Sequence, residues 1–119
     1  MQTLQATVQT TLEHHLEAFG KNDLHEIMED FTERSEVWTP EGAIVGLESI
    51  SSFFTYAFTL FPKESTRLDI KQMIVKENRA YIVWDAESSV INVPIGTDSF
   101  EIIDGKILWQ TTAIQMIPK

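Results

Sequence analysis

Two ionisable side chains, His15 and Asp98, stand at positions that predict contact with an apolar interior. His15 belongs to a segment with helical periodicity and lies roughly 40° from the centre of its apolar face, whereas His14 lies roughly 140° away. We therefore expect His14 to face solvent and His15 to point into the core or a cavity. An imidazole in a cavity can move a proton near neutral pH; the alternative is a core histidine whose nitrogens are satisfied by neighbouring groups.

Asp98 shares a strand phase with Phe100 and Ile102, while Ser99 and Glu101 alternate outward. An ionised carboxylate on an apolar face costs several kcal/mol unless it is paired. Asp98 is therefore expected either to have a partner or to have a raised pKa, so that it is protonated and donates a hydrogen bond. The alternative is that the strand begins at Asp98 and its carboxyl group reaches water.

Aromatic residues supply candidate walls for a cavity, although each one taken alone is more typical of core packing. The set consists of Trp38, Tyr56, Tyr81, Trp84 and Trp109. Asp85 lies on the strand phase opposite to Trp84, and this strand alone leaves open which of the two faces inward.

Other kinds of site have weaker support. No serine occurs in the context of a nucleophile elbow. His14, His15 and His25 are expected on different faces or separate helices, so we predict no metal site, and we expect no cofactor. The acidic residues 26–36 lack the alternating oxygen ligands of a calcium loop, and we interpret them as a solvated helix face followed by a loop.

The composition is that of one small acidic domain. The chain has 119 residues, of which 43% are hydrophobic, and a net charge of −9, so we predict a single domain over residues 1–119. Nucleic-acid binding is not expected, because an acidic chain without a basic cluster repels phosphates. Neither a membrane span nor a signal peptide is expected, since long apolar runs are absent from the sequence. The lack of cysteine is compatible with a reducing cytoplasm, where we expect the protein.

The first half of the chain has helical periodicity. The predicted elements are helices over residues 3–19, 24–31 and 47–61 and, over residues 37–42, a short strand broken by a Pro/Gly turn. Thr3 is the expected N-cap of the first helix and Gly20 its stop. The third helix must end before Pro62.

The second half has strand periodicity. The predicted strands cover residues 66–76, 80–91, 97–103 and 106–117, with turns at 77–78, 94–96 and 104–105. Asp104-Gly105 is a strong hairpin signal, and short turns between consecutive strands give an antiparallel meander. Helices followed by a meander predict an α+β domain, with the helices packed on one face of the sheet.

The last predicted strand is apolar on both faces. Trp109 and Ile117 share one strand phase, whereas Ile114 and Met116 share the other. We expect one face to pack on the core and the other on a second copy of the chain, which predicts a homodimer through the sheet.

Four segments, in this order and spacing, carry a resemblance over nearly the whole chain. They are residues 15–24 (HLEAFGKNDL), 37–42 (VWTPEG), 46–54 (GLESISSFF) and 98–106 (DSFEIIDGK). The chain resembles the SnoaL-like and ketosteroid-isomerase-like members of the nuclear transport factor 2-like superfamily. The resemblance implies a cone-shaped, cystatin-like α+β barrel whose bent sheet and helices enclose an apolar pocket, usually in a dimer.

The resemblance also implies roles for individual residues. Asp98 matches the acid that donates a hydrogen bond to the dienolate oxygen in ketosteroid isomerases, and His15 matches the tyrosine of the same oxyanion hole. Thr39 stands where those enzymes have the catalytic aspartate, and Phe54 where they have a supporting tyrosine. Because a threonine hydroxyl has no useful basicity, ordinary steroid isomerisation is not expected.

The resulting expectation is a pocket for a small apolar molecule, in one of three uses. The first is an acid–base isomerase, cyclase or lyase acting on an enolisable carbonyl compound, with His15 as base or hydrogen-bond donor and Asp98 as its partner or as a neutral acid. The second is non-catalytic ligand binding, and the third is a homodimeric interaction module. The expected ligand-binding residues are Trp38, Thr39, Phe54, Tyr56, Trp84, Phe100 and Trp109.

Overall fold

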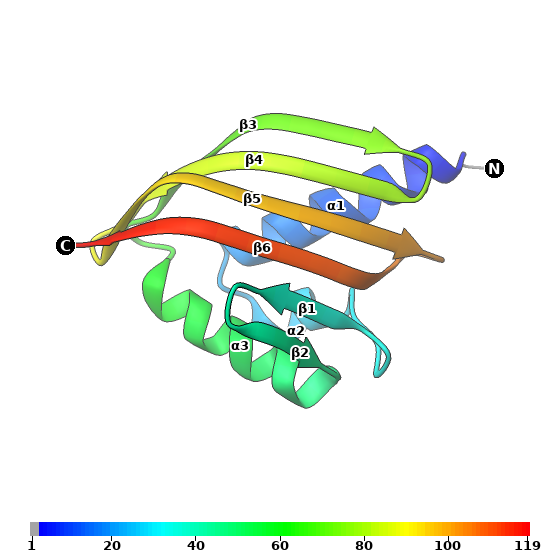
Figure 1. Ribbon diagram of the computed structural model, residues 1–119, viewed down its shortest axis with the longest axis horizontal. Helices are drawn as coiled ribbons and strands as arrows, with labels where there is room; N and C mark the ends of the chain where they lie inside the picture. Colours follow the sequence, from blue (N-terminus) through cyan, green and yellow to red (C-terminus); the bar gives the residue numbers. More distant parts are fainter. Residues whose placement is uncertain (1–2) are drawn as a thin grey trace.

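The computed structural model describes residues 3–119, which form helices packed on the concave side of a curved sheet (Figure 1). In chain order the elements are α1 (Leu4–Gly20), α2 (Leu24–Met28), β1 (Glu36–Thr39), β2 (Gly42–Val45), α3 (Leu47–Leu60), β3 (Arg67–Lys76), β4 (Arg79–Glu87), β5 (Ile91–Ile103) and β6 (Lys106–Pro118). The strand order is β2-β1-β6-β5-β4-β3, and only the β1–β6 pair of this described sheet is parallel. The predicted α+β class is confirmed, and the curved sheet stays open.

The start of α1 is as predicted, but its end differs. Thr3 Oγ1 accepts a hydrogen bond from the backbone N–H of Ala6 at 3.0 Å, which confirms Thr3 as the N-cap. Gly20 is still helical, and the left-handed residue is Asn22, with φ of 53°. The Asn22 side chain donates to the carbonyl of Phe61 at 3.0 Å. The link from α1 to α2 is thus fixed by a long-range bond that local sequence does not reveal.

The Pro/Gly turn predicted within residues 37–42 is confirmed, and the chain on its two sides forms a hairpin of two strands, β1 and β2. Thr39 Oγ1 accepts from the backbone N–H of Glu41 at 3.1 Å and donates to the carbonyl of Gly42 at 3.2 Å. Gly42 has φ of 138°, a conformation that favours glycine. Because β1 also pairs with β6, this hairpin forms one edge of the sheet (Figure 1).

The predicted meander is confirmed in β3 to β6, including its last turn. Asp104 and Gly105 have φ of 52° and 74°, as a tight hairpin turn requires. The prediction of a turn at residues 94–96 is wrong, because β5 begins at Ile91 and runs through Pro94. Pro94 has no N–H to donate, and it is tolerated because the β5–β6 register shifts between Asn92 and Ile95.

Gly96 has a packing reason for its place inside β5. A Cβ at this position would lie 2.5 Å from the Trp84 ring. The indole therefore lies directly on the backbone of β5, where β4 and β5 also shift register between Trp84 and Ala86. The sequence predicted a turn at this glycine, but in the structure the glycine leaves room for an aromatic ring to pack on the strand.

The core lies between the concave face of the sheet and the helices. Among its largest fully buried side chains are Phe54, Phe100, Leu12, Ile27, Ile50, Ile82, Ile102 and Ile107. Helical periodicity predicted that these α1 and α3 residues are buried, and strand periodicity predicted the same for Phe100 and Ile102 on β5. The sequence of β4 leaves its inward face open. No helix within residues 3–119 is both long enough and apolar enough to cross a membrane.

Candidate functional site

A cavity of about 410 Å³ lies between the helices and the concave face of the sheet. Its wall is mostly apolar, and its lining aromatic residues are Phe19, Phe53, Phe54, Tyr56, Phe61 and Trp84. Three of its polar residues, His15, Asp98 and Gln110, are almost fully buried. A mainly apolar cavity of this size with a few converging polar groups is typical of a site for a small organic molecule.

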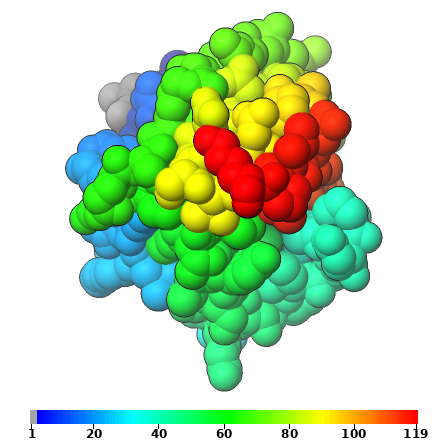
Figure 2. All heavy atoms as spheres, turned by 90° about the vertical axis from the view of Figure 1, so that its left-hand side faces the viewer, coloured from blue at the N-terminus to red at the C-terminus, as the bar shows by residue number. Residues whose placement is uncertain are grey.

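Exposed lining residues mark the mouth of this cavity. They are Pro40 and Glu41 in the β1–β2 turn, Tyr56 on α3, Ile70 on β3 and Met116 near the end of β6. Figure 2 shows the end of the molecule at which α3 (green) and the end of β6 (red) come together beside the β1–β2 turn (cyan-green). The polar groups therefore lie deep, and the mouth is formed by segments far apart in the sequence.

Asp98 is buried in the middle of the sheet and accepts three hydrogen bonds. Trp84 Nε1 and Thr112 Oγ1 donate to Oδ1 at 3.1 and 3.0 Å, and Gln110 Nε2 donates to Oδ2 at 3.0 Å. Asp98 pairs with Ile82 on β4, so the alternative of a carboxyl group reaching water from a strand start is wrong. Burial raises the pKa of Asp98 to about 6, although the three donors act to lower it. Near neutral pH this arrangement favours an ionised carboxylate.

His15 is only 3% exposed and points inward, as its place on the helix predicted. Its ring meets the edges of Phe31, Phe54 and Phe100 at centroid separations of 5.9, 5.7 and 5.6 Å. Burial, followed by the charge of His14, lowers the pKa of His15 to about 3. The imidazole is therefore neutral at physiological pH, a weak base but a competent hydrogen-bond donor. Its Nδ1 is buried and has no partner among the described residues.

Gln110 is the site residue that sequence reasoning missed. It is 2% exposed, it lines the cavity, and its Nε2 binds Asp98 while its Oε1 has no partner within residues 3–119. The available signal was phase, because Gln110 and Thr112 share the alternation of Ile114 and Met116. The phase of these two polar residues therefore predicts that they point inward, as the phase of Asp98 does.

The structure divides the other predicted ligand-binding residues into two groups. Thr39, Phe54, Tyr56 and Trp84 line the cavity together with His15. Trp84 thus faces inward, which settles the choice left open by the sequence.

Asp85 lies outward, 3.0 Å from Arg67 and 3.4 Å from Lys71. Arg67 holds the pKa of Asp85 below its usual range. The carboxylate beside Trp84 in the sequence is thus part of an ion-pair cluster on the outer face of the sheet.

The other three predicted ligand-binding residues, Trp38, Phe100 and Trp109, are not among the residues that line the cavity. Trp38 is 47% exposed, because β1 buries Val37 and turns the next side chain outward. Its ring packs edge-on against Trp109 with centroids 5.4 Å apart. Phe100 is buried behind the His15 ring and packs in the core.

His14 differs from its prediction as well. It lies between α1 and α2, where its Nδ1 donates to the Asp30 carboxylate at 2.8 Å. Asp30 is 6% exposed, so the interpretation of the acidic segment as a fully solvated face is wrong at this residue. The hydrogen bond to Asp30 raises the pKa of His14, while burial raises the pKa of Asp30.

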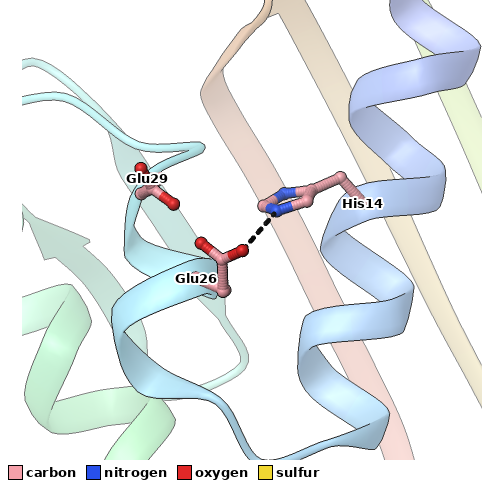
Figure 3. Close-up of side chains that lie close together, drawn as sticks. All are labelled: His14, Glu26 and Glu29. Carbon is pink, nitrogen blue, oxygen red and sulfur yellow. Dashed lines mark ion pairs between the residues drawn. The ribbon is translucent and has the colours of Figure 1, made fainter.

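His14 also turns toward two carboxylates (Figure 3). Its Nε2 lies 3.8 Å from Glu26 Oε1, and one ligand atom from each of His14, Glu26 and Glu29 lies within 4.8 Å of the others. Of the described residues, these are the ones close enough together to hold a cation, and similar exposed groups are common without one. They lie outside the lining of the apolar cavity.

The comparisons with known proteins agree with this architecture. The family of SnoaL-like domains matches residues 12–109, and no curated protein matches the chain. Similar solved structures include a putative ketosteroid isomerase from Kribbella flavida (12% identity, TM-score 0.76, 92% of this chain and 78% of that chain). Others are TerC co-crystallised with polyporic acid (16%, 0.75, 92% and 92%) and AclR, a putative hydroxylase from Streptomyces galilaeus (14%, 0.77, 93% and 90%). At these identities the likeness concerns the fold alone.

Proposed function

The chain belongs to the family of SnoaL-like domains, and from this premise we propose that it is an acid–base enzyme acting on a small apolar compound with an enolisable carbonyl group. One observation carries the proposal: a buried carboxylate and a buried neutral imidazole line the same apolar cavity. Structural neighbours named as a putative isomerase and a putative hydroxylase are compatible with chemistry in this fold, but fold alone does not determine activity.

In this proposal Asp98 is the base. Its Oδ2 receives one hydrogen bond, from Gln110, and so keeps a lone pair for a substrate proton. A pKa of about 6 leaves it ionised near pH 7 and still basic enough to accept that proton. This reverses the expectation of a neutral, donating Asp98, because all three of its neighbours donate to it.

His15 is the hydrogen-bond donor. When Asp98 removes the proton from the carbon beside the carbonyl, the C–H electrons form a C=C bond and the carbonyl oxygen becomes an enolate. A neutral imidazole can stabilise that oxygen by donating a hydrogen bond from its N–H group. In a β,γ-unsaturated ketone the enolate is a dienolate, and return of the proton from Asp98 to its γ-carbon gives the conjugated isomer. In a dicarbonyl compound the enolate carbon attacks the second carbonyl carbon, the C=O electrons move to its oxygen, and the proton from Asp98 goes to that oxygen, which closes a ring.

Thr39 has no part in the proton transfer. Its hydroxyl lies at the hairpin tip, where it is hydrogen-bonded to Glu41 and Gly42. Thr39 therefore stabilises the turn, and the acid–base chemistry is assigned to Asp98 and His15 at the buried end of the cavity.

Deuterium exchange at the α-carbon of 1-tetralone, followed by NMR in D₂O, tests this proposal. The wild-type chain should exchange these protons faster than buffer, and Asp98→Asn should return the rate to that of buffer. Asp85→Asn, on the outer face of the same sheet, is the matched control and should exchange like wild type. Equal exchange by wild type and Asp98→Asn would remove Asp98 from the mechanism.

Non-catalytic binding is the second candidate, and the threonine at position 39 favours it. A binding protein would retain a ligand unchanged. Native mass spectrometry of the purified chain separates the two: a retained compound of constant mass, without α-proton exchange, supports binding over catalysis.

A further inference from the structure

Two unpartnered polar atoms at the buried end of the cavity describe the ligand more closely. Within residues 3–119, the buried side-chain atoms without a hydrogen-bond partner are His15 Nδ1 and Gln110 Oε1, and both residues line the cavity. Buried polar groups are normally paired, so a pair of exceptions at one end of one cavity calls for an explanation. The simplest explanation is a bound molecule that forms hydrogen bonds with both residues.

The orientation of Gln110 follows from Asp98. The ionised carboxylate can only accept, so the amide must present Nε2 to it, as the 3.0 Å bond shows. A flipped amide would set Oε1 against a carboxylate oxygen. Oε1 is therefore directed away from Asp98. Gln110 lines the cavity and the terminal torsion of glutamine is soft, so we infer that rotation of the amide presents Oε1 to a bound molecule.

The electrostatics of the lining limit the ligand further. Its charged residues are Glu41 and Asp98, and no lysine or arginine is among the described lining residues. With a net chain charge of −9, the cavity disfavours carboxylates and phosphates. Anions are thereby disfavoured, and the mostly apolar lining favours a neutral molecule over a cation. The polar groups of that molecule must include a donor for Gln110 Oε1.

We propose that the ligand is a neutral hydroxylated carbonyl compound with an apolar, aromatic-sized body, whose hydroxyl donates to Gln110 Oε1 while its carbonyl accepts from His15. This deepens the proposed function and rests on it, because the same carbonyl is the one that Asp98 enolises. Gln110 thereby becomes a specificity-determining residue, since a ligand without the hydroxyl leaves its oxygen buried and unpaired.

The test uses 5-, 6- and 7-hydroxy-1-tetralone, their methoxy ethers and unsubstituted 1-tetralone, with affinities measured by isothermal titration calorimetry. At least one hydroxy isomer should bind about tenfold or more tightly than both its ether and 1-tetralone. Gln110→Met, which keeps the shape but removes the amide, should abolish this preference. Gln115→Met, at an exposed position of the same strand, should retain it.

The remaining outcomes contradict the inference in distinguishable ways. Equal binding of hydroxy, methoxy and unsubstituted ketones overturns it while leaving the proposed function standing, and this comparison needs only the wild-type chain. A hydroxyl preference that survives in Gln110→Met also overturns it. Failure of every tetralone to bind overturns the inference together with the proposed function.

Discussion

Ionisation of Asp98 connects the stability of the fold to its candidate chemistry at the scale of one residue. Burial raises the pKa of this carboxyl group to about 6. For an acid with a raised folded-state pKa, the stabilising contribution is complete below the unfolded pKa and is lost as pH rises through the folded value. The loss by pH 8 is about 3 kcal/mol.

Asp98→Asn should therefore be more stable than wild type at pH 8 and close to it at pH 4, because an amide has no proton to lose. Its side-chain oxygen still accepts from Trp84 and Thr112. Urea unfolding of both proteins at the two pH values measures the difference. A variant that is less stable than wild type at pH 8 would show that the carboxylate is a net stabiliser.

A second titration belongs to the pair of His14 and Asp30. The hydrogen bond to Asp30 raises the pKa of His14, so its stabilising contribution is complete below about pH 6.5 and is lost as pH rises through the folded-state value. The groups that face this pair are Glu26 and Glu29 on the α2 side and Lys106. Burial raises the pKa of Asp30, so this carboxyl group also makes stability fall as pH rises, in a range that begins at the ordinary carboxyl pKa of about 3.9.

The stability of wild type should thus fall as pH rises above about 6.5, and His14→Gln should flatten this part of the profile. Thermal unfolding across the pH range is the measurement. His25→Gln, at an exposed position on α2, is the matched control and should keep the wild-type slope. An unchanged slope in His14→Gln would remove this pair as the source.

The elements show where sequence patterns suffice and where they fail. The three helices and the meander follow from periodicities that extend over many residues, and the same periodicities placed His15 and Asp98 inside. β1 has only four residues, so its alternation could not show that Trp38 faces outward. Pro94 and Gly96 carry turn chemistry, but the bulge and the Trp84 ring that explain them depend on strands distant in the sequence.

Gly96 gives a prediction at this scale. Gly96→Ala should destabilise the chain by about 1–3 kcal/mol, because the new methyl group overlaps the Trp84 ring and must displace it. A change in tryptophan fluorescence should accompany the loss of stability. Displacement of the ring should also weaken the hydrogen bond from Trp84 Nε1 to Asp98. Gly20→Ala is the control, since no atom lies within 4 Å of its added Cβ. Equal stability of Gly96→Ala and wild type would show that the ring moves freely.

For the whole molecule, the outer face of the sheet is the feature left without a partner. Trp38, Ile74, Tyr81 and Ile95 are large apolar residues that are exposed on β1, β3, β4 and β5. We propose that a second copy of the chain covers this face, as the two apolar phases of the last strand predicted.

Sedimentation at micromolar concentration should therefore give a dimer, and Ile74→Glu combined with Ile95→Glu should give a monomer. Thermal unfolding confirms that the double variant is folded. A wild-type monomer under these conditions would contradict the proposal.

The proposed ionised base, Asp98, lies at the buried end of the apolar cavity, and the pH dependence of α-proton exchange reports its ionisation. The rate of 1-tetralone exchange by the wild-type chain should rise with pH, bend near pH 6 and level off above pH 7, following the ionisation of Asp98. His15, with a pKa of about 3, adds no second bend in this range. A rate without a bend near pH 6, or the same profile in Asp98→Asn, would contradict the proposed role of Asp98.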